Sequence, residues 1–162
     1  MSGLELRPVG RHNFDAVRAL DAGDAQQQVA SNLYSIAEAA VMPEAWIRAI
    51  YVDGRPVGFL LLNDPTLSAD AEEKRFSLWR LMIDKSEQGR GFGRLALLAL
   101  IEHVRTRPGA RELFTSYVHD GPTGPNLADF YASLGFVATG EIDDDETVLC
   151  LSLDDSTTRR ME

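Results

Sequence analysis

Residues 75–107, RFSLWRLMIDKSEQGRGFGRLALLALIEHVRTR, contain three kinds of sequence in direct succession. The first part, 75–83, is rich in aromatic and aliphatic residues and has the length of a β-strand. A polar break at 84–87 precedes a glycine-rich segment at 88–93 and then an amphipathic run with apolar residues at helical spacing. A Pro-Gly pair ends that run. This order predicts a strand, a glycine-rich turn and a helix.

The glycine-rich turn is suited to an anionic ligand, and a diphosphate fits it best. The first N–H groups of a helix have no internal partner and carry partial positive charge. Gly89, Gly91 and Gly93 let that backbone approach a ligand closely. Arg90 and Arg94 add positive charge, and the spacing of a P-loop is absent. A glycine-rich turn without a ligand is the alternative interpretation.

Length and composition indicate one folded domain at 1–154, followed by a C-terminal tail at 155–162. The hydrophobic share of 44% excludes the disordered and membrane classes. The chain start has no signal-peptide pattern, so we expect a cytoplasmic protein. The formal charge of −9 argues against nucleic acid and anionic membranes as partners, and it is compatible with a cationic substrate.

The sequence contains no motif for a catalytic metal site or for a nucleophilic cysteine or serine. The single cysteine, Cys150, lies in an apolar run and is expected to be buried rather than nucleophilic. The three histidines are scattered, and no His-Glu-x-x-His or Cys-x-x-Cys motif occurs, so no metal site is predicted. A Gly-x-Ser-x-Gly nucleophile motif is also absent.

The rest of the chain alternates between strand and helix patterns around the opening stretch. We expect helices around 14–20, at 24–40 with a break, and at 126–134. Asp53-Gly54 predicts a two-residue hairpin turn. The predicted order is β-α-α-β-β-β-α-β-α-β-β, an α/β (α+β) domain. The further strands are expected at 4–9, 46–52, 55–62, 112–118, 136–140 and 147–153.

Two motifs resemble those of the GNAT superfamily of N-acetyltransferases. The first is Gln-x-x-Gly-x-Gly at 88–93, and the second is FYASLGF at 130–136. The resemblance covers nearly the whole chain. It implies a mixed central sheet of about six to seven strands with about four helices. In that fold the fourth and fifth strands splay apart, and acetyl-CoA, the expected cosubstrate, lies in the gap.

By the same resemblance, the backbone of Leu81, Met82 and Ile83 is expected to bind the pantetheine arm. An N–H group of Met82 or Ile83 would polarise the thioester carbonyl as an oxyanion donor. The remaining motif residues are expected to hold the pyrophosphate: Gln88, Gly89, Arg90, Gly91, Phe92, Gly93 and Arg94.

The second motif implies a catalytic role for Tyr131. In the family, the tyrosine at this position lies near the sulfur of CoA and acts as the general acid toward the departing thiolate. We expect Phe130 to pack onto the sheet and Tyr131 to face the cleft, although an ordinary packing role for Tyr131 is the alternative. Many relatives have an asparagine where this chain has Gly124, so a cofactor contact is transferred to Asn126 instead.

Within the family, the stretches 31–39, 50–59 and 78–84 resemble bacterial spermine/spermidine and diamine acetyltransferases. Glu38 would then hold an ammonium group of the acceptor. The general base is open between Glu38, Glu44, Asp84 and water. The acidic run 143–146 is interpreted as a solvated hairpin turn.

The sequence therefore predicts an N-acetyltransferase that moves an acetyl group directly from acetyl-CoA to a small-molecule amine, with a polyamine as the leading acceptor. Two alternatives stay open: a catalytically silent CoA-binding sensor, and an enzyme that acetylates a protein N-terminus or lysine. Relatives often form homodimers, but no sequence feature decides the oligomeric state.

Overall fold

The computed structural model describes residues 3–23, 30–120 and 124–154, and the predicted tail at 155–162 lies outside this part. The described residues form a seven-stranded sheet and four α-helices, in the predicted order. The helices are α1 (Phe14–Arg18), α2 (Asn32–Val41), α3 (Phe92–Arg105) and α4 (Gly124–Ser133). The strands are β1 (Leu4–Arg7), β2 (Ala45–Val52), β3 (Arg55–Asn63), β4 (Ser77–Ile83), β5 (Glu112–Val118), β6 (Val137–Asp143) and β7 (Glu146–Ser152).

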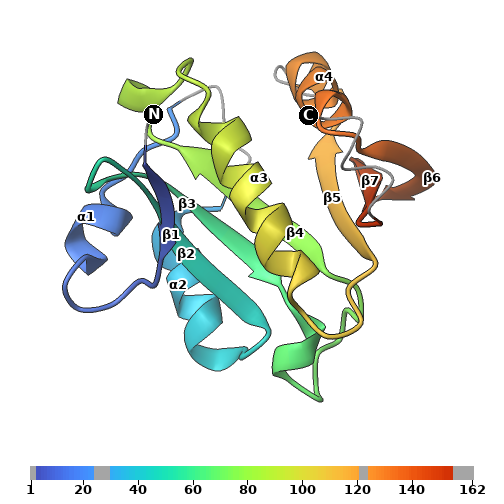
Figure 1. Ribbon diagram of the computed structural model, residues 1–162, viewed down its shortest axis with the longest axis horizontal. Coiled ribbons are helices and arrows are strands. Elements are labelled where there is room, and N and C mark those ends of the chain that lie inside the picture. Colours follow the sequence, from blue (N-terminus) through green and yellow to red (C-terminus); the bar gives the residue numbers. More distant parts are fainter. Residues whose placement is uncertain (1–2, 24–29, 121–123, 155–162) are drawn as a thin grey trace.

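The sheet has the strand order β1-β2-β3-β4-β5-β7-β6, and β4 and β5 are its parallel pair. These two strands are in register only at Ser77 opposite Phe114 and Leu78 opposite Thr115. Beyond Leu78 they diverge, and α4 lies at the far end of β5 (Figure 1). The predicted splay between the fourth and fifth strands is therefore confirmed.

The hairpin between β2 and β3 forms as the sequence predicts. Asp53 and Gly54 both have positive φ angles, 50° and 79°. Two consecutive positive φ angles define the type I′ turn that joins tightly twisted antiparallel strands. This turn sets Arg55 as the first residue of β3.

Two helix starts differ from the sequence expectation. The helix predicted at 24–40 begins only at Asn32, and residues 24–29 lie outside the described part of the chain. The hydroxyl of Ser31 accepts a hydrogen bond of 3.1 Å from the Tyr34 N–H, which caps the helix there. At the other end of the chain, α4 begins at Gly124 rather than at Asn126.

The helices cover both faces of the sheet. α3 crosses one face (Figure 1), where its buried side chains join the larger apolar cluster together with residues of α4. α1 and α2 pack with the smaller cluster on the opposite face, which includes Val17 and Met82. In the described ranges, no helix has the length and apolar character needed to cross a membrane.

Candidate active site

In the described chain, the edge of β4 that faces β5 has no strand partner beyond Leu78, although the Ile83 carbonyl accepts a hydrogen bond from the Gln88 amide. The Asp84 N–H donates to the Val57 carbonyl of β3 at 2.8 Å, so alternate residues of β4 before it also direct their polar groups to β3. The main-chain groups of Leu81 and Ile83 consequently point toward β5, which has already diverged. An open strand edge of this kind can bind the amides of an extended ligand.

This register changes the expected role of Met82. Met82 lies opposite Phe59 and belongs to the set of residues that bond to β3, so its N–H does not reach the gap. The reason is a β-bulge at Trp79, where Leu61 pairs with Arg80 and Leu62 with Leu78. Without that extra residue, Met82 would face β5. Of the two residues expected to supply an oxyanion donor, Ile83 directs its N–H to the gap, as Leu81 also does, and Met82 does not.

The turn before α3 has the geometry that the glycines predict. Gly89 and Gly91 have φ angles of 79° and 82°, and a Cβ atom added to either would meet no other atom within 4 Å. α3 begins at Phe92, so the N–H groups of its first turn lack helical partners. In the described chain, none of the N–H groups from 88 to 94 has a backbone acceptor, and they remain available to an anion.

The polar side chains of the turn bind the protein itself. The Gln88 amide donates to the carbonyls of Ala22 and Ile83, both at 2.9 Å. Arg94 donates to the Ser133 hydroxyl at 3.2 Å and so links α3 to the end of α4. In this structure, Gln88 thus anchors the turn to two backbone carbonyls, and Arg94 connects the helix after the turn to α4.

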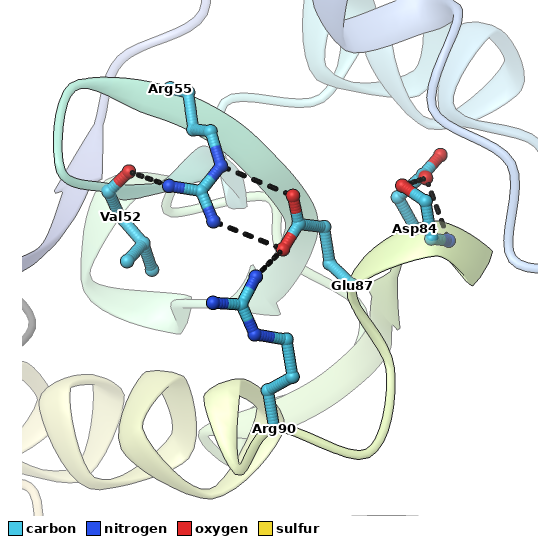
Figure 2. Close-up of polar contacts among 6 residues, drawn as sticks. Val52, Arg55, Asp84, Glu87 and Arg90 are labelled. Carbon is cyan, nitrogen blue, oxygen red and sulfur yellow. Dashed lines mark hydrogen bonds and ion pairs between the residues drawn. The ribbon is translucent and has the colours of Figure 1, made fainter.

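Arg90 points toward Glu87 and the β2–β3 hairpin (Figure 2). Its guanidinium donates to the Glu87 carboxylate at 2.6 Å, and the same carboxylate binds Arg55 through two hydrogen bonds of 3.1 Å. Sequence analysis missed Arg55, because a residue after a hairpin turn carries no signal of a contact 32 positions later.

Tyr131 lies where β4 and β5 begin to diverge, because its side chain contacts Thr115, the last residue of β5 that pairs with β4. Its ring packs against Phe130 and Phe136 at centroid distances of 5.2 and 5.4 Å, and only 6% of the residue is exposed. Burial raises the pKa of the Tyr131 phenol, a hydrogen bond with Thr115 acts in the opposite direction, and the charge of Glu146 raises it further. Tyr131 is therefore a neutral phenol that can act as a proton donor.

Phe130 packs against the larger core cluster as expected, and Tyr131 is buried within that cluster. Phe130 is half-buried, while Tyr131 belongs to the larger core cluster. A Cβ atom on Gly93 would lie 3.9 Å from the Phe130 ring, so Phe130 borders the start of α3. Asn126 is exposed near the start of α4, and its side chain forms no hydrogen bond with the described residues.

Glu38 does not offer a free carboxylate. It forms an ion pair with Arg80, whose guanidinium also donates to the Ser35 hydroxyl at 3.1 Å. The two side chains are 17% and 18% exposed, so the pair is largely shielded from water. Because Arg80 neutralises it, Glu38 is poorly placed to hold an ammonium group alone.

The other two expected bases are also occupied or distant. Asp84 accepts hydrogen bonds from the Asp21 N–H and from the N–H and hydroxyl of Ser86. Burial favours a higher pKa for Asp84, but these hydrogen bonds outweigh it and lower the pKa. Glu44 is buried just before β2, level with Asn63 and Ser77 at the closed end of the β4–β5 pair.

The sequence interpretation assigned Glu146 to a solvated turn, but the structure places this residue in a strand. Glu146 begins β7 opposite Val118, and its carboxylate accepts a hydrogen bond of 3.0 Å from the Ser116 hydroxyl. Its charge acts on Tyr131. The antiparallel pairing of β5 with β7 places Glu146 beside Ser116 and Val118, and its position along the chain does not indicate these neighbours.

Coenzyme A fits these residues by chemistry. Its diphosphate matches the free N–H groups beside Gly89 and Gly91, and its pantetheine amides match the main-chain groups of Leu81 and the N–H of Ile83. In the described ranges, no group of three or more His, Cys, Asp or Glu side chains has the arrangement of a metal site.

Comparison with known proteins agrees with this geometry. Residues 15–136 match the model of the Acetyltransferase (GNAT) family. A probable spermine N(1)-acetyltransferase of Bacillus subtilis subsp. natto is 32% identical over 95 residues, which is 58% of this chain and 60% of the relative. The chain thus matches less than two thirds of that relative's length.

Solved structures share the fold at low identity. The PaiA N-acetyltransferase of Thermoplasma acidophilum, solved with coenzyme A, has a TM-score of 0.64 and 15% identity, covering 93% of this chain and 99% of that one. The ribosomal-protein-S18-alanine N-acetyltransferase of Escherichia coli has a TM-score of 0.66 and 16% identity, covering 95% of both chains. At these identities the likeness extends to the fold alone.

Proposed function

Because the chain belongs to the acetyltransferase (GNAT) family, we propose that it transfers an acetyl group from acetyl-CoA to the primary amine of a small molecule. The observation that carries the proposal is the open edge of β4. The free N–H groups before α3 lie at one end of this edge, and the buried Tyr131 phenol lies where β4 and β5 begin to diverge. This arrangement gives each part of a thioester cosubstrate a matching protein group.

In the proposed reaction, the amine nitrogen forms a bond to the acetyl carbonyl carbon, and the carbon–sulfur bond breaks. An N–H of Leu81 or Ile83 stabilises the charge that develops on the carbonyl oxygen. Tyr131 gives its proton to the departing sulfur and regains one from solvent. Water takes the proton that the amine must lose, and Glu146 is the carboxylate that attracts the ammonium form.

A polyamine is the proposed acceptor. The spermine acetyltransferase named above supports it through the shared sequence, and the net charge of −9 favours a cationic substrate. Glu146 rather than Glu38 is the carboxylate that we assign to the acceptor, because Arg80 occupies Glu38. Replacement Glu146→Gln is expected to raise the KM for a diamine roughly tenfold and to leave the KM for acetyl-CoA unchanged.

The test of the proposed function is thiol release from acetyl-CoA with polyamines, amino acids and N-terminal peptides as separate acceptors. Turnover with spermine or spermidine and none with peptides supports the proposal. Turnover with peptides alone identifies a protein acetyltransferase. If CoA binds in a calorimeter and no acceptor is acetylated, the chain is a coenzyme sensor.

A further inference from the structure

The carboxylate of Glu87 is shared by two arginines from different parts of the chain (Figure 2). Arg55 binds it with both ends of its guanidinium fork, Nε to Oε1 and Nη2 to Oε2, each at 3.1 Å. Arg90 donates to Oε2 at 2.6 Å. The Glu87 side chain is 16% exposed, whereas those of Arg55 and Arg90 are 42% and 54% exposed. The acid is therefore the enclosed centre of the cluster.

These contacts connect the glycine-rich turn to a rigid element. Arg55 is the first residue of β3 and follows the type I′ turn, so the β2–β3 hairpin fixes its backbone. Arg90 lies between Gly89 and Gly91, which have no side chains of their own to anchor the turn. The Arg90 guanidinium also lies 4.9 Å from the centre of the Phe92 ring.

We propose that Arg55 and Glu87 are positioning residues for coenzyme binding: they hold Arg90, and through it the turn at 88–93, so that the backbone N–H groups meet the diphosphate. Arg90 serves this purpose instead of binding a phosphate directly. The inference rests on the proposed function, because it concerns the same coenzyme site. Glycine costs more conformational entropy to order than other residues, so a turn with several glycines gains most from an external anchor.

Attraction by charge and positioning of the turn predict opposite changes in coenzyme affinity when Glu87 is neutralised. Replacement Glu87→Gln removes one negative charge beside an anion site, so attraction by charge alone would strengthen coenzyme binding. Loss of positioning would weaken it, because an amide cannot hold two guanidinium groups as a carboxylate does. Replacement Arg55→Lys keeps the charge but loses the two-pronged contact. The positioning role predicts weaker binding in both variants.

The experiment measures KM and kcat with two donors, acetyl-CoA and acetyl-pantetheine, which has the thioester but no diphosphate. Glu87→Gln and Arg55→Lys are expected to raise the KM for acetyl-CoA roughly tenfold and to leave kcat/KM for acetyl-pantetheine unchanged. Asp15→Asn, which removes an exposed charge on α1, is the control for net charge and is expected to change neither. Thermal unfolding confirms that each variant is folded.

A lower or unchanged KM for acetyl-CoA in Glu87→Gln overturns the proposal, as does an equal loss with both donors. Calorimetric titration with CoA and with pantetheine repeats the comparison without turnover. A wild-type protein that binds CoA but acetylates no amine would contradict the proposed function alone. The relative CoA affinities of the variants would still decide the role of the cluster.

Discussion

Arg80 of β4 forms an ion pair with Glu38 of α2 and joins the bulged part of the strand to the helix that covers it. We expect Arg80→Met to lower the free energy of unfolding by roughly 1–3 kcal/mol, because it leaves a shielded carboxylate without its partner. The double variant Arg80→Met/Glu38→Gln should recover part of this loss, as measured by urea denaturation.

The matched control for that cycle is the exposed pair of Arg18 and Asp15, with side chains 52% and 87% exposed. Arg18→Met should lower the free energy of unfolding by less than about 1 kcal/mol.

Glu38→Gln should change the KM for the acceptor less than about threefold, since the paired acid is not free to bind an ammonium. A large rise in that KM at unchanged stability would restore Glu38 as the acceptor-binding residue.

Tyr131→Phe tests the proposed proton donor. The ring contacts with Phe130 and Phe136 do not need the hydroxyl, so only the hydrogen bond with Thr115 is lost and stability should fall by about 0.5–1.5 kcal/mol. We expect kcat to fall about a hundredfold or more, with KM for acetyl-CoA nearly unchanged. A variant with wild-type kcat would assign Tyr131 to packing alone.

The raised pKa of Tyr131 also predicts a stability change in strong base. The folded phenol keeps its proton above the ordinary value of 10.0. Its contribution to stability is therefore complete below that pH and is lost as pH rises through the folded pKa. Comparing wild type with Tyr131→Phe by denaturation across pH 9–12 should show a steeper decline in the wild type.

Gly91→Ala should damage coenzyme binding through the backbone. Gly91 has a φ of 82°, which costs a residue with a Cβ atom about 1–2 kcal/mol. Gly109, beyond the other end of α3, has a φ of 73° and equally free space. Gly109→Ala should therefore lose similar stability in thermal unfolding without raising the KM for acetyl-CoA. Equal KM values in the two variants would argue against an anion site at the turn.

The element order and the turn were predictable because they depend on local patterns. The Asp53-Gly54 pair and the run of glycines from Gly89 specify backbone shapes that their neighbours cannot change. The apolar spacing after Phe92 likewise placed one face of α3 in the core. The start of α2 was less predictable, because a single side-chain hydrogen bond at Ser31 caps the helix there.

The assignment of site atoms required the register of the sheet. One extra residue at Trp79 decides whether Met82 or Ile83 faces the gap, and nothing in the composition of β4 reveals a bulge. Glu38 was similarly read as a free acid because its partner Arg80 lies 42 residues away. The burial of Tyr131 and its contact with Thr115 also depend on how α4 settles beside β5.

Cys150 should be unreactive in the folded protein. Its thiol is buried on β7 and lies 3.1 Å from the Glu112 carboxylate. Burial first, and then the hydrogen bond and negative charge of Glu112, raise its pKa to about 12. The thiolate, which is the reactive form, is therefore scarce at pH 8. The reaction with Ellman's reagent should be at least about a hundredfold slower in native than in urea-unfolded protein.

The same shift gives the sign of the pH dependence. The folded thiol binds its proton more tightly than the unfolded one, whose ordinary pKa is 9.0. This contribution to stability is present below pH 9 and is lost as pH rises toward 12. Glu112→Gln removes the charge that opposes ionisation, so it should lower the pKa of Cys150 and speed the reaction of the native thiol. If native protein reacts with Ellman's reagent as fast as the unfolded chain, Cys150 is not shielded by the pairing of β7 with β5.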